Sequence, residues 1–277
     1  KLIQAGNNGT FTPLIPSSRT TPYIIISHHN LWTEASAYAA YRSNKYDVVL
    51  ANVEELYDQF GYGVEKDPLA IRRFCQYAVN TWRVSPAFLF LLGKGIHTPL
   101  YRQDTNAYKA CLVPSFGYPS SDILFTAQFK SSSLKPAIPT GRLAATDGSE
   151  VDNYLNKVKT YEDPFTPPAQ WQKRVIHFCG GSDLAEQNAF LAYLNSYAGY
   201  IVNPYFGGNV YTFKKTTSDP IQITLADSVT RLINNGVSIM TFFGHASGNN
   251  FDESLDAPSD YNNVGKYPFI IANAFFS

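Results

Sequence analysis

Short apolar runs alternate with amphipathic segments along the first half of the chain. An apolar run of about four to eight residues is typical of a buried strand, whereas apolar residues three and four positions apart are typical of a helix. This pattern predicts strands over 23–27, 46–51 and 87–92. It predicts helices between them, capped by Thr33 and by Asp67. The second of these helices carries its apolar residues on one face: Ile71, Phe74, Cys75 and Ala78.

The second half of the chain repeats this alternation after a break. Residues 162–171 contain three prolines, which interrupt regular structure and indicate a boundary. Before the break, Ser149 and Asp152 form a capping-box pattern that predicts a helix. After it, the pattern predicts helices begun by Asp183 and ended by Gly236, and strands over 174–179, 210–214, 237–243 and 269–272.

Strands that alternate with helices indicate parallel sheets covered by helices on both faces. The predicted fold class is therefore α/β, with two doubly wound parallel-sheet subdomains. We expect an irregular lead-in over 1–21, a first subdomain over 22–165 and a second over 166–277. The second ends at Ser277, just past a strand. We expect it to be incomplete, as in a truncated or processed product.

The composition argues against several classes of protein. With 44% apolar and 16% charged residues, the chain has enough burial surface for a globular fold. Its 22 basic residues balance 22 acidic ones, which argues against a nucleic-acid partner. No apolar run approaches the roughly 18 to 20 residues of a transmembrane segment. Low charge and abundant Tyr, Asn, Ser and Thr resemble secreted proteins, so we expect a secreted or cell-surface location, although the chain carries no signal peptide.

Candidate chemistry gathers where two neighbouring strands end. In open parallel sheets, ligands bind at the carboxyl ends of the strands. The strand over 237–243 leads into Gly244-His245, and the strand over 269–272 leads into 273–277. A histidine in this position is a candidate general acid or base if a nucleophile lies on the neighbouring strand. The alternative is a loop histidine held by hydrogen bonds, and the spacing alone leaves both open.

Several motifs, in order, resemble the gingipain family of clan CD cysteine peptidases. They are DPLAIRRFCQYAVN with FLFLLGKG, then IPTGRLAATDGSEVDNYLNKVKTYED, then INNGVSIMTFFGHASGNNF, and last YPFIIANAFFS. The resemblance runs over most of the chain and implies a caspase-like fold, cysteine endopeptidase activity without a cofactor, and peptide or protein substrates. Related proteins include the peptidase that trims sorting signals in type IX secretion, so secretion-apparatus or surface proteins are implied as partners.

The chain departs from the family at the position that matters most. His245 stands where the family has its catalytic histidine, with Gly244 before it and Ala246 in place of a glycine. The family's nucleophilic cysteine follows an alanine, but here Phe275 follows Ala274. A phenyl ring cannot become a thiolate or attack a carbonyl.

Two interpretations follow from this departure. The first is a catalytically inactive domain that binds peptides or serves as a scaffold in secretion or surface attachment. The alternative is an active cysteine peptidase or transpeptidase that uses another nucleophile. The family's acidic helper corresponds to the region of Cys179 and Asp183.

Other candidates carry less chemistry. Cys75 and Cys111 lie in apolar segments, a helix and a short predicted strand, and are expected in the core. Asp122 is expected to be structural, capping a turn. Ser247 and Ser277 lack the Gly-x-Ser-x-Gly elbow of serine hydrolases. The acidic segment with Asp252, Glu253 and Asp256 is either a calcium loop or a solvated loop. Metal-ligand spacing is absent among His28, His29, His97 and His177.

Overall fold

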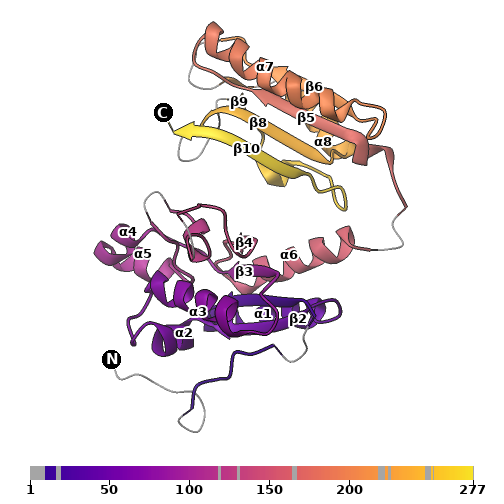
Figure 1. The fold of residues 1–277 in the computed structure, drawn as a ribbon. Coiled ribbons are helices and arrows are strands. Elements are labelled where there is room, and N and C mark those ends of the chain that lie inside the picture. The colour runs from indigo at the N-terminus through magenta and orange to yellow at the C-terminus, as the bar shows by residue number, and fades with distance from the viewer. Residues whose placement is uncertain are drawn as a thin grey trace. The chain divides into compact units, whose positions relative to one another are not determined.

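The chain folds into two compact units, Lys1–Asn156 and Lys157–Ser277. The computed structural model describes residues 10–16, 20–117, 120–129, 132–163, 167–217, 222–223, 226–246, 251 and 253–276. Each unit is built around its own four-stranded parallel sheet (Figure 1).

The sheet of the first unit has the strand order β2-β1-β3-β4, and every neighbouring pair is parallel. Its strands are β1 (Pro22–Ser27), β2 (Asp47–Asn52), β3 (Phe88–Leu92) and β4 (Thr140–Leu143). The α-helices connected to them are α1 (Trp32–Arg42), α2 (Val53–Phe60), α3 (Pro68–Thr81), α4 (Thr98–Gln103), α5 (Thr105–Ala110) and α6 (Gly148–Tyr161).

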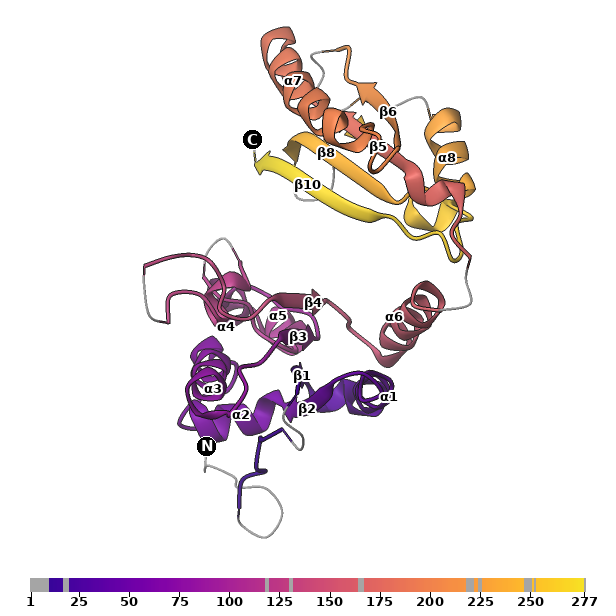
Figure 2. The same cartoon turned by 45° about the vertical axis from the view of Figure 1, so that its right-hand side comes forward.

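Helices cover both faces of this sheet because its strands are apolar on both sides. Ile24 and Leu89 belong to the same buried cluster as Ile71 and Phe74 of α3. On the other face, Phe90 stacks against both Tyr38 of α1 and Tyr154 of α6, with ring centroids 5.1 and 5.7 Å away. Neighbouring residues of a strand point to opposite faces, so a continuous apolar run serves two helical layers. Figure 2 shows these layers on either side of the strands.

The second unit follows the same plan with the strand order β10-β8-β5-β6, again all parallel. On one face of the sheet, Val229 and Ile233 of α8 pack with Met240. On the other face, Phe190 of α7 packs with Cys179. The elements are β5 (Arg174–Cys179), α7 (Leu184–Ile201), β6 (Asn209–Lys214), α8 (Ala226–Asn235), β8 (Ile239–Ala246) and β10 (Phe269–Phe276), with the short pair β7 (Gln222–Ile223) and β9 (Glu253–Ser254) beside them.

Two doubly wound, parallel α/β sheets are thus confirmed, and so is the order of the predicted strands. The predicted ends of two helices also hold: Asp67 caps α3 by accepting a hydrogen bond from the Leu69 N–H, and Gly236 follows α8 with a φ of +96°, which favours glycine. The remaining regular segments are short 3-10 helices: η2 (His29–Leu31), η3 (Ile123–Phe125), η4 (Gln170–Lys173) and η5 (Pro258–Asp260).

Three local predictions were wrong. Thr33 does not cap α1; it lies inside the helix, which begins at Trp32 directly after η2. Ser149 does not cap α6, because Asp147 accepts the hydrogen bond from the Glu150 N–H instead. The segment around Cys111 is not a strand: Cys111 ends α5, where its N–H still bonds to the Ala107 carbonyl. In the last two cases, a neighbouring carboxylate or a helix turn satisfies the backbone N–H group.

None of the helices that the structure describes combines the length and the apolar character needed to cross a membrane.

Candidate functional site

Strands β8 and β10 bring His245 and Phe275 together at the carboxyl edge of the second sheet. The two strands pair in parallel with Phe275 directly opposite His245 and Ala274 opposite Gly244. The sequence predicted loops here, but both strands continue through these positions. Because both strands extend this far, the backbone pairing places residue 275 opposite residue 245. The side chain of Phe275 and all of Ser247 and Ser277 lie outside the described part of the structure.

The His245 imidazole has a carboxylate and a hydroxyl as polar neighbours. Its Nε2 lies 3.1 Å from Oε1 of Glu186, and its Nδ1 lies 3.3 Å from Oγ of Ser182. Ser182 Oγ also donates to Oε2 of Glu186 at 2.7 Å. The imidazole is 19% exposed and Glu186 is 30% exposed. The three side chains form a closed hydrogen-bonded ring that orients the imidazole.

The loop after β5 positions this ring. Gly181 has a φ of +127°, and a Cβ there would lie 2.8 Å from the Gln187 nitrogen, so the loop can pass this close to α7 only with glycine. Asp183 then caps α7 by accepting a hydrogen bond from the Glu186 N–H at 2.9 Å. Glu186 itself accepts from the Ser182 N–H at 2.8 Å. Loop and helix thereby hold Ser182 and Glu186 against His245.

Comparison with known proteins places the chain in a family. The model for peptidase family C25 matches residues 17–274. The chain belongs to peptidase family C25. No curated protein matches it.

Solved structures share its fold at low sequence identity. The Arg-specific cysteine proteinase gingipain R (RGPB) matches with a TM-score of 0.68 and 14% identity, over 95% of this chain and 56% of that chain. A complex of the pro- and mature domains of RgpB from Porphyromonas gingivalis gives a TM-score of 0.68 and 14% identity, over 92% and 55%. A chain described only as a protease gives 0.66 and 18%, over 92% and 52%. The family C25 chain therefore has the caspase-like gingipain fold and spans about half the length of these chains.

Within this family C25 chain, the acidic residue beside the histidine is Glu186 rather than Asp183. In the sequence, Glu186 stands three positions after Asp183, the residue predicted to begin the helix. A glutamate at that position often reaches back toward the backbone that precedes the helix, and here that backbone belongs to Ser182. The spacing of Asp183 and Glu186 thus indicated that Glu186 faces the loop before α7. It did not indicate that α7 packs close enough to β8 for Glu186 to reach His245.

The cysteines of the family C25 chain are all buried. Cys179 has no exposed surface and packs with Phe190 and Leu194, its Sγ 3.3 Å from the Gln187 carbonyl oxygen. Burial raises the pKa of the Cys75 thiol to about 12, and it also raises the pKa of Cys111. Because the thiolate is the reactive form, the geometry gives none of the three the setting of a nucleophile.

The acidic segment proposed as a calcium loop is only partly described. Asp252 and the side chain of Glu253 lie outside the described residues. Asp256 accepts a hydrogen bond from Thr230 Oγ1 at 2.9 Å. Calcium binding by this segment therefore stays a prediction.

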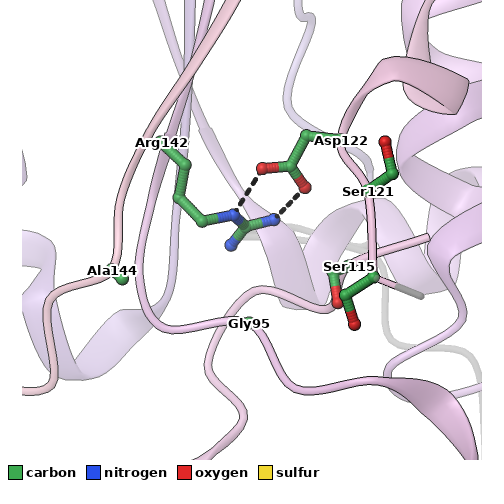
Figure 3. Close-up of a pocket in the computed structure, with 7 residues that line it drawn as sticks. Gly95, Ser115, Ser121, Asp122, Arg142 and Ala144 are labelled. Carbon is green, nitrogen blue, oxygen red and sulfur yellow. Dashed lines mark hydrogen bonds and ion pairs between the residues drawn. The ribbon is translucent and has the colours of Figure 1, made fainter. Parts of the chain in front are cut away.

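Arg142, in the family-like Pro-x-Gly-Arg segment, borders a cavity of about 210 Å³ in the first unit (Figure 3). Its guanidinium pairs with Asp122 through two hydrogen bonds of 2.8 Å. It also donates to the backbone carbonyls of Gly93, Val113 and Pro114. These bonds use all five guanidinium N–H groups, so Arg142 links β4 to the segments that follow β3 and α5 and offers no donor to a ligand.

Asp122 is structural, as expected, but through this ion pair with Arg142. It makes no side-chain cap. The hydrogen bond at the start of η3 comes instead from the Ile123 N–H to Ser121 Oγ, at 3.2 Å.

Proposed function

We propose that this family C25 chain is a peptide-binding domain of a pseudopeptidase. It keeps the peptidase fold and the pair formed by His245 and Glu186, but it does not hydrolyse peptide bonds. One observation carries the proposal: Phe275 occupies the strand position in register with His245. Covalent peptidase chemistry needs a nucleophile beside the acid–base residue. The family's cysteine position carries a hydrocarbon ring here, and the native thiols are buried elsewhere.

The remaining polar groups suit binding rather than bond cleavage. His245, Glu186 and Ser182 present donors and acceptors at the carboxyl edge of a parallel sheet, which is where such sheets bind ligands. A peptide offers complementary N–H and C=O groups to this edge. The composition and the family support a secreted or surface protein, and a partner within a secretion or attachment apparatus.

The test compares native protein with a restored nucleophile. The full chain is incubated with a peptidyl acyloxymethyl ketone, and its intact mass is measured. We expect no adduct on the native protein, a single adduct on Phe275→Cys, and much slower labelling of the double variant Phe275→Cys/His245→Ala. Phe276→Cys is the matched control, since position 276 pairs with Ala246 instead.

Peptide binding is measured separately with a degenerate peptide pool. We expect the native protein to retain a subset of peptides uncleaved, and His245→Ala to retain fewer. Cleavage of the pool by native protein, abolished by His245→Ala, would favour the active-peptidase alternative and overturn the proposal.

A further inference from the structure

The carboxyl edge of the first sheet gathers two histidines and a carboxylate. Ser27 ends β1 and Asn52 ends β2, and these two residues are register partners. His28 and His29 follow directly after β1, and Glu54 lies in the first turn of α2, directly after β2. The parallel pairing therefore brings together side chains that the sequence separates.

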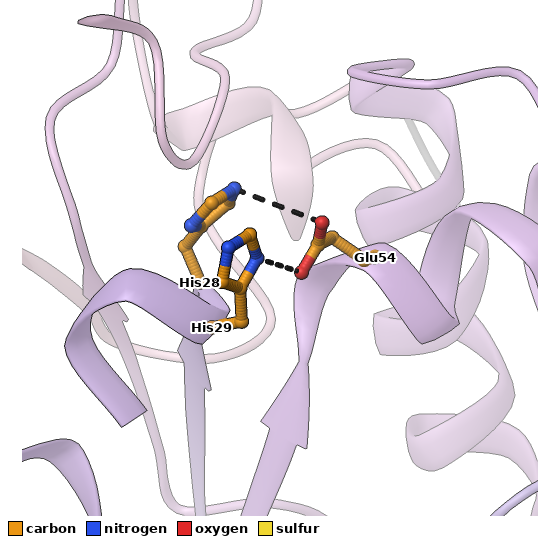
Figure 4. A group of neighbouring side chains, drawn as sticks. All are labelled: His28, His29 and Glu54. Carbon is orange, nitrogen blue, oxygen red and sulfur yellow. Dashed lines mark hydrogen bonds and ion pairs between the residues drawn. The ribbon is translucent and has the colours of Figure 1, made fainter. Parts of the chain in front are cut away.

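Figure 4 shows both imidazoles turned toward the same carboxylate. Nδ1 of His29 lies 2.6 Å from Oε2 of Glu54. Nε2 of His28 lies 3.9 Å from Oε1 of the same residue. One ligand atom from each of the three residues lies within 4.8 Å of the others. Two ligand atoms that each lie about 2.1 Å from a tetrahedral zinc ion are about 3.4 Å apart. The His29–Glu54 distance is shorter than this value and the His28–Glu54 distance is longer.

Local hydrogen bonds hold the His28 side chain and the backbone of Glu54 in place. The Asn52 side chain accepts a hydrogen bond from the Glu54 N–H at 2.9 Å, which fixes the start of α2. His28 Nδ1 accepts from the Asn30 N–H at 3.2 Å, which turns Nε2 toward Glu54. The His28 side chain is 11% exposed, whereas His29 is 60% and Glu54 38% exposed. The His28 side chain is thus mostly buried, and the other two side chains are open to an ion arriving from solvent.

A competing cation near the group already has partners of its own. Lys66 acts electrostatically on His28. The ammonium of Lys66 donates to the Cys111 carbonyl and lies 4.5 Å from the centre of the Tyr108 ring, so other groups partner that competing charge.

We propose that His28, His29 and Glu54 bind a divalent transition-metal ion of the zinc class, with a water molecule completing its coordination. Two imidazoles and one carboxylate are a donor set that zinc takes in sites with an open position. Calcium prefers six to eight oxygen ligands, which this group does not supply. None of the residues of the His245 site takes part.

Metal binding has a structural consequence that a purely hydrogen-bonded group lacks. Ligation through Nε2 of His28 places the ring proton on Nδ1, which then no longer accepts from the Asn30 N–H. The backbone amide resonance of Asn30 should therefore shift as the ion binds.

The test uses the full chain without an affinity tag, stripped of metal with a chelator. Zn²⁺ is titrated by calorimetry, and Co²⁺ by its visible absorption. We expect one ion per chain, no displacement by excess Ca²⁺, and weaker binding as the pH falls, because protons compete for the ligands. Absence of stoichiometric binding of both ions would overturn the proposal.

Variants locate the ion. Glu54→Gln and His29→Ala should each weaken Zn²⁺ binding by about tenfold or more, since losing even an outer partner of a metal ligand has that effect. Glu55→Gln is the matched control in the same helical turn; Glu55 accepts from the Thr12 N–H, and its loss should leave the affinity unchanged.

Circular dichroism checks that each variant is folded. If Glu54→Gln unfolds, His29→Ala decides, because the His29 side chain is mostly exposed. Equal affinities for native protein and folded His29→Ala would refute the assignment.

Discussion

Glu186 and His245 come from different elements, α7 and β8, and meet with Oε1 of the glutamate 3.1 Å from Nε2 of the imidazole. Phe275 is the register partner of His245 on the neighbouring strand. In the proposed function the pair is the acid–base half of a site that lacks its nucleophile, and its consequences can be measured once a thiol is placed at position 275.

Glu186→Gln should slow labelling of the Phe275→Cys variant by the acyloxymethyl ketone. The carboxylate orients the imidazole, and general acid–base assistance contributes about 10²–10⁴-fold to a rate, so we expect a loss of about tenfold or more. Rates are followed by intact mass against time. Asp183→Asn is the control, because Asp183 only caps α7. Equal slowing by both substitutions would mean that helix position, and not the carboxylate, matters.

Arg142→Lys should destabilise the first unit by about 2–3 kcal/mol, because a lysine cannot replace the two-bond contact with Asp122 and leaves carbonyl groups without donors. Urea unfolding measures the change. Arg73→Lys is the matched control, since Arg73 contacts the Phe60 carbonyl with one bond. We expect it to cost less than about 1 kcal/mol. Similar losses for both would contradict the structural role assigned to Arg142.

His177→Leu should make stability less dependent on pH. His177 is fully buried in β5, and neither ring nitrogen has a hydrogen-bond partner among the described residues. Burial lowers its pKa, so the unfolded chain binds a proton more readily, and stability falls as the pH drops below about 6.5. Melting temperatures at pH 5 and pH 8 measure this. The gain from the substitution should be larger at pH 5, and an identical gain at both values would argue against a neutral buried His177.

Native protein should resist thiol alkylation. All three cysteines are buried, and burial raises the pKa values of Cys75 and Cys111, which keeps those two thiols protonated. Iodoacetamide at pH 8 should add mass only in denaturant, where three equivalents are expected. Rapid modification of folded protein at Cys179 would revive the alternative in which that residue acts as a nucleophile.

Most of the fold follows from local pattern. The apolar run 23–27 and the strand 174–179 appear almost as predicted, because burial between two helical layers requires continuous apolar residues. The helix α2 was missed, although Asn52 caps it and Leu56 and Tyr57 form its buried face. The predicted end of the last strand was also too early. β10 continues to Phe276 because pairing with β8 satisfies the backbone groups of its last residues, and the polar and aromatic side chains there give no sign of this pairing.

By itself, the sequence determined the parallel α/β class, most of the longer strands and helices, and the placement of His245 and Phe275 near the ends of two neighbouring strands. Those features depend on periodicity and on the identity of single residues, which are local properties. Only the tertiary structure decided which carboxylates join the histidines: Glu186 beside His245, and Glu54 facing both His28 and His29. Carboxylates are common on helix first turns, and such a group gains a partner only when parallel strand pairing and helix packing bring distant segments within hydrogen-bond distance.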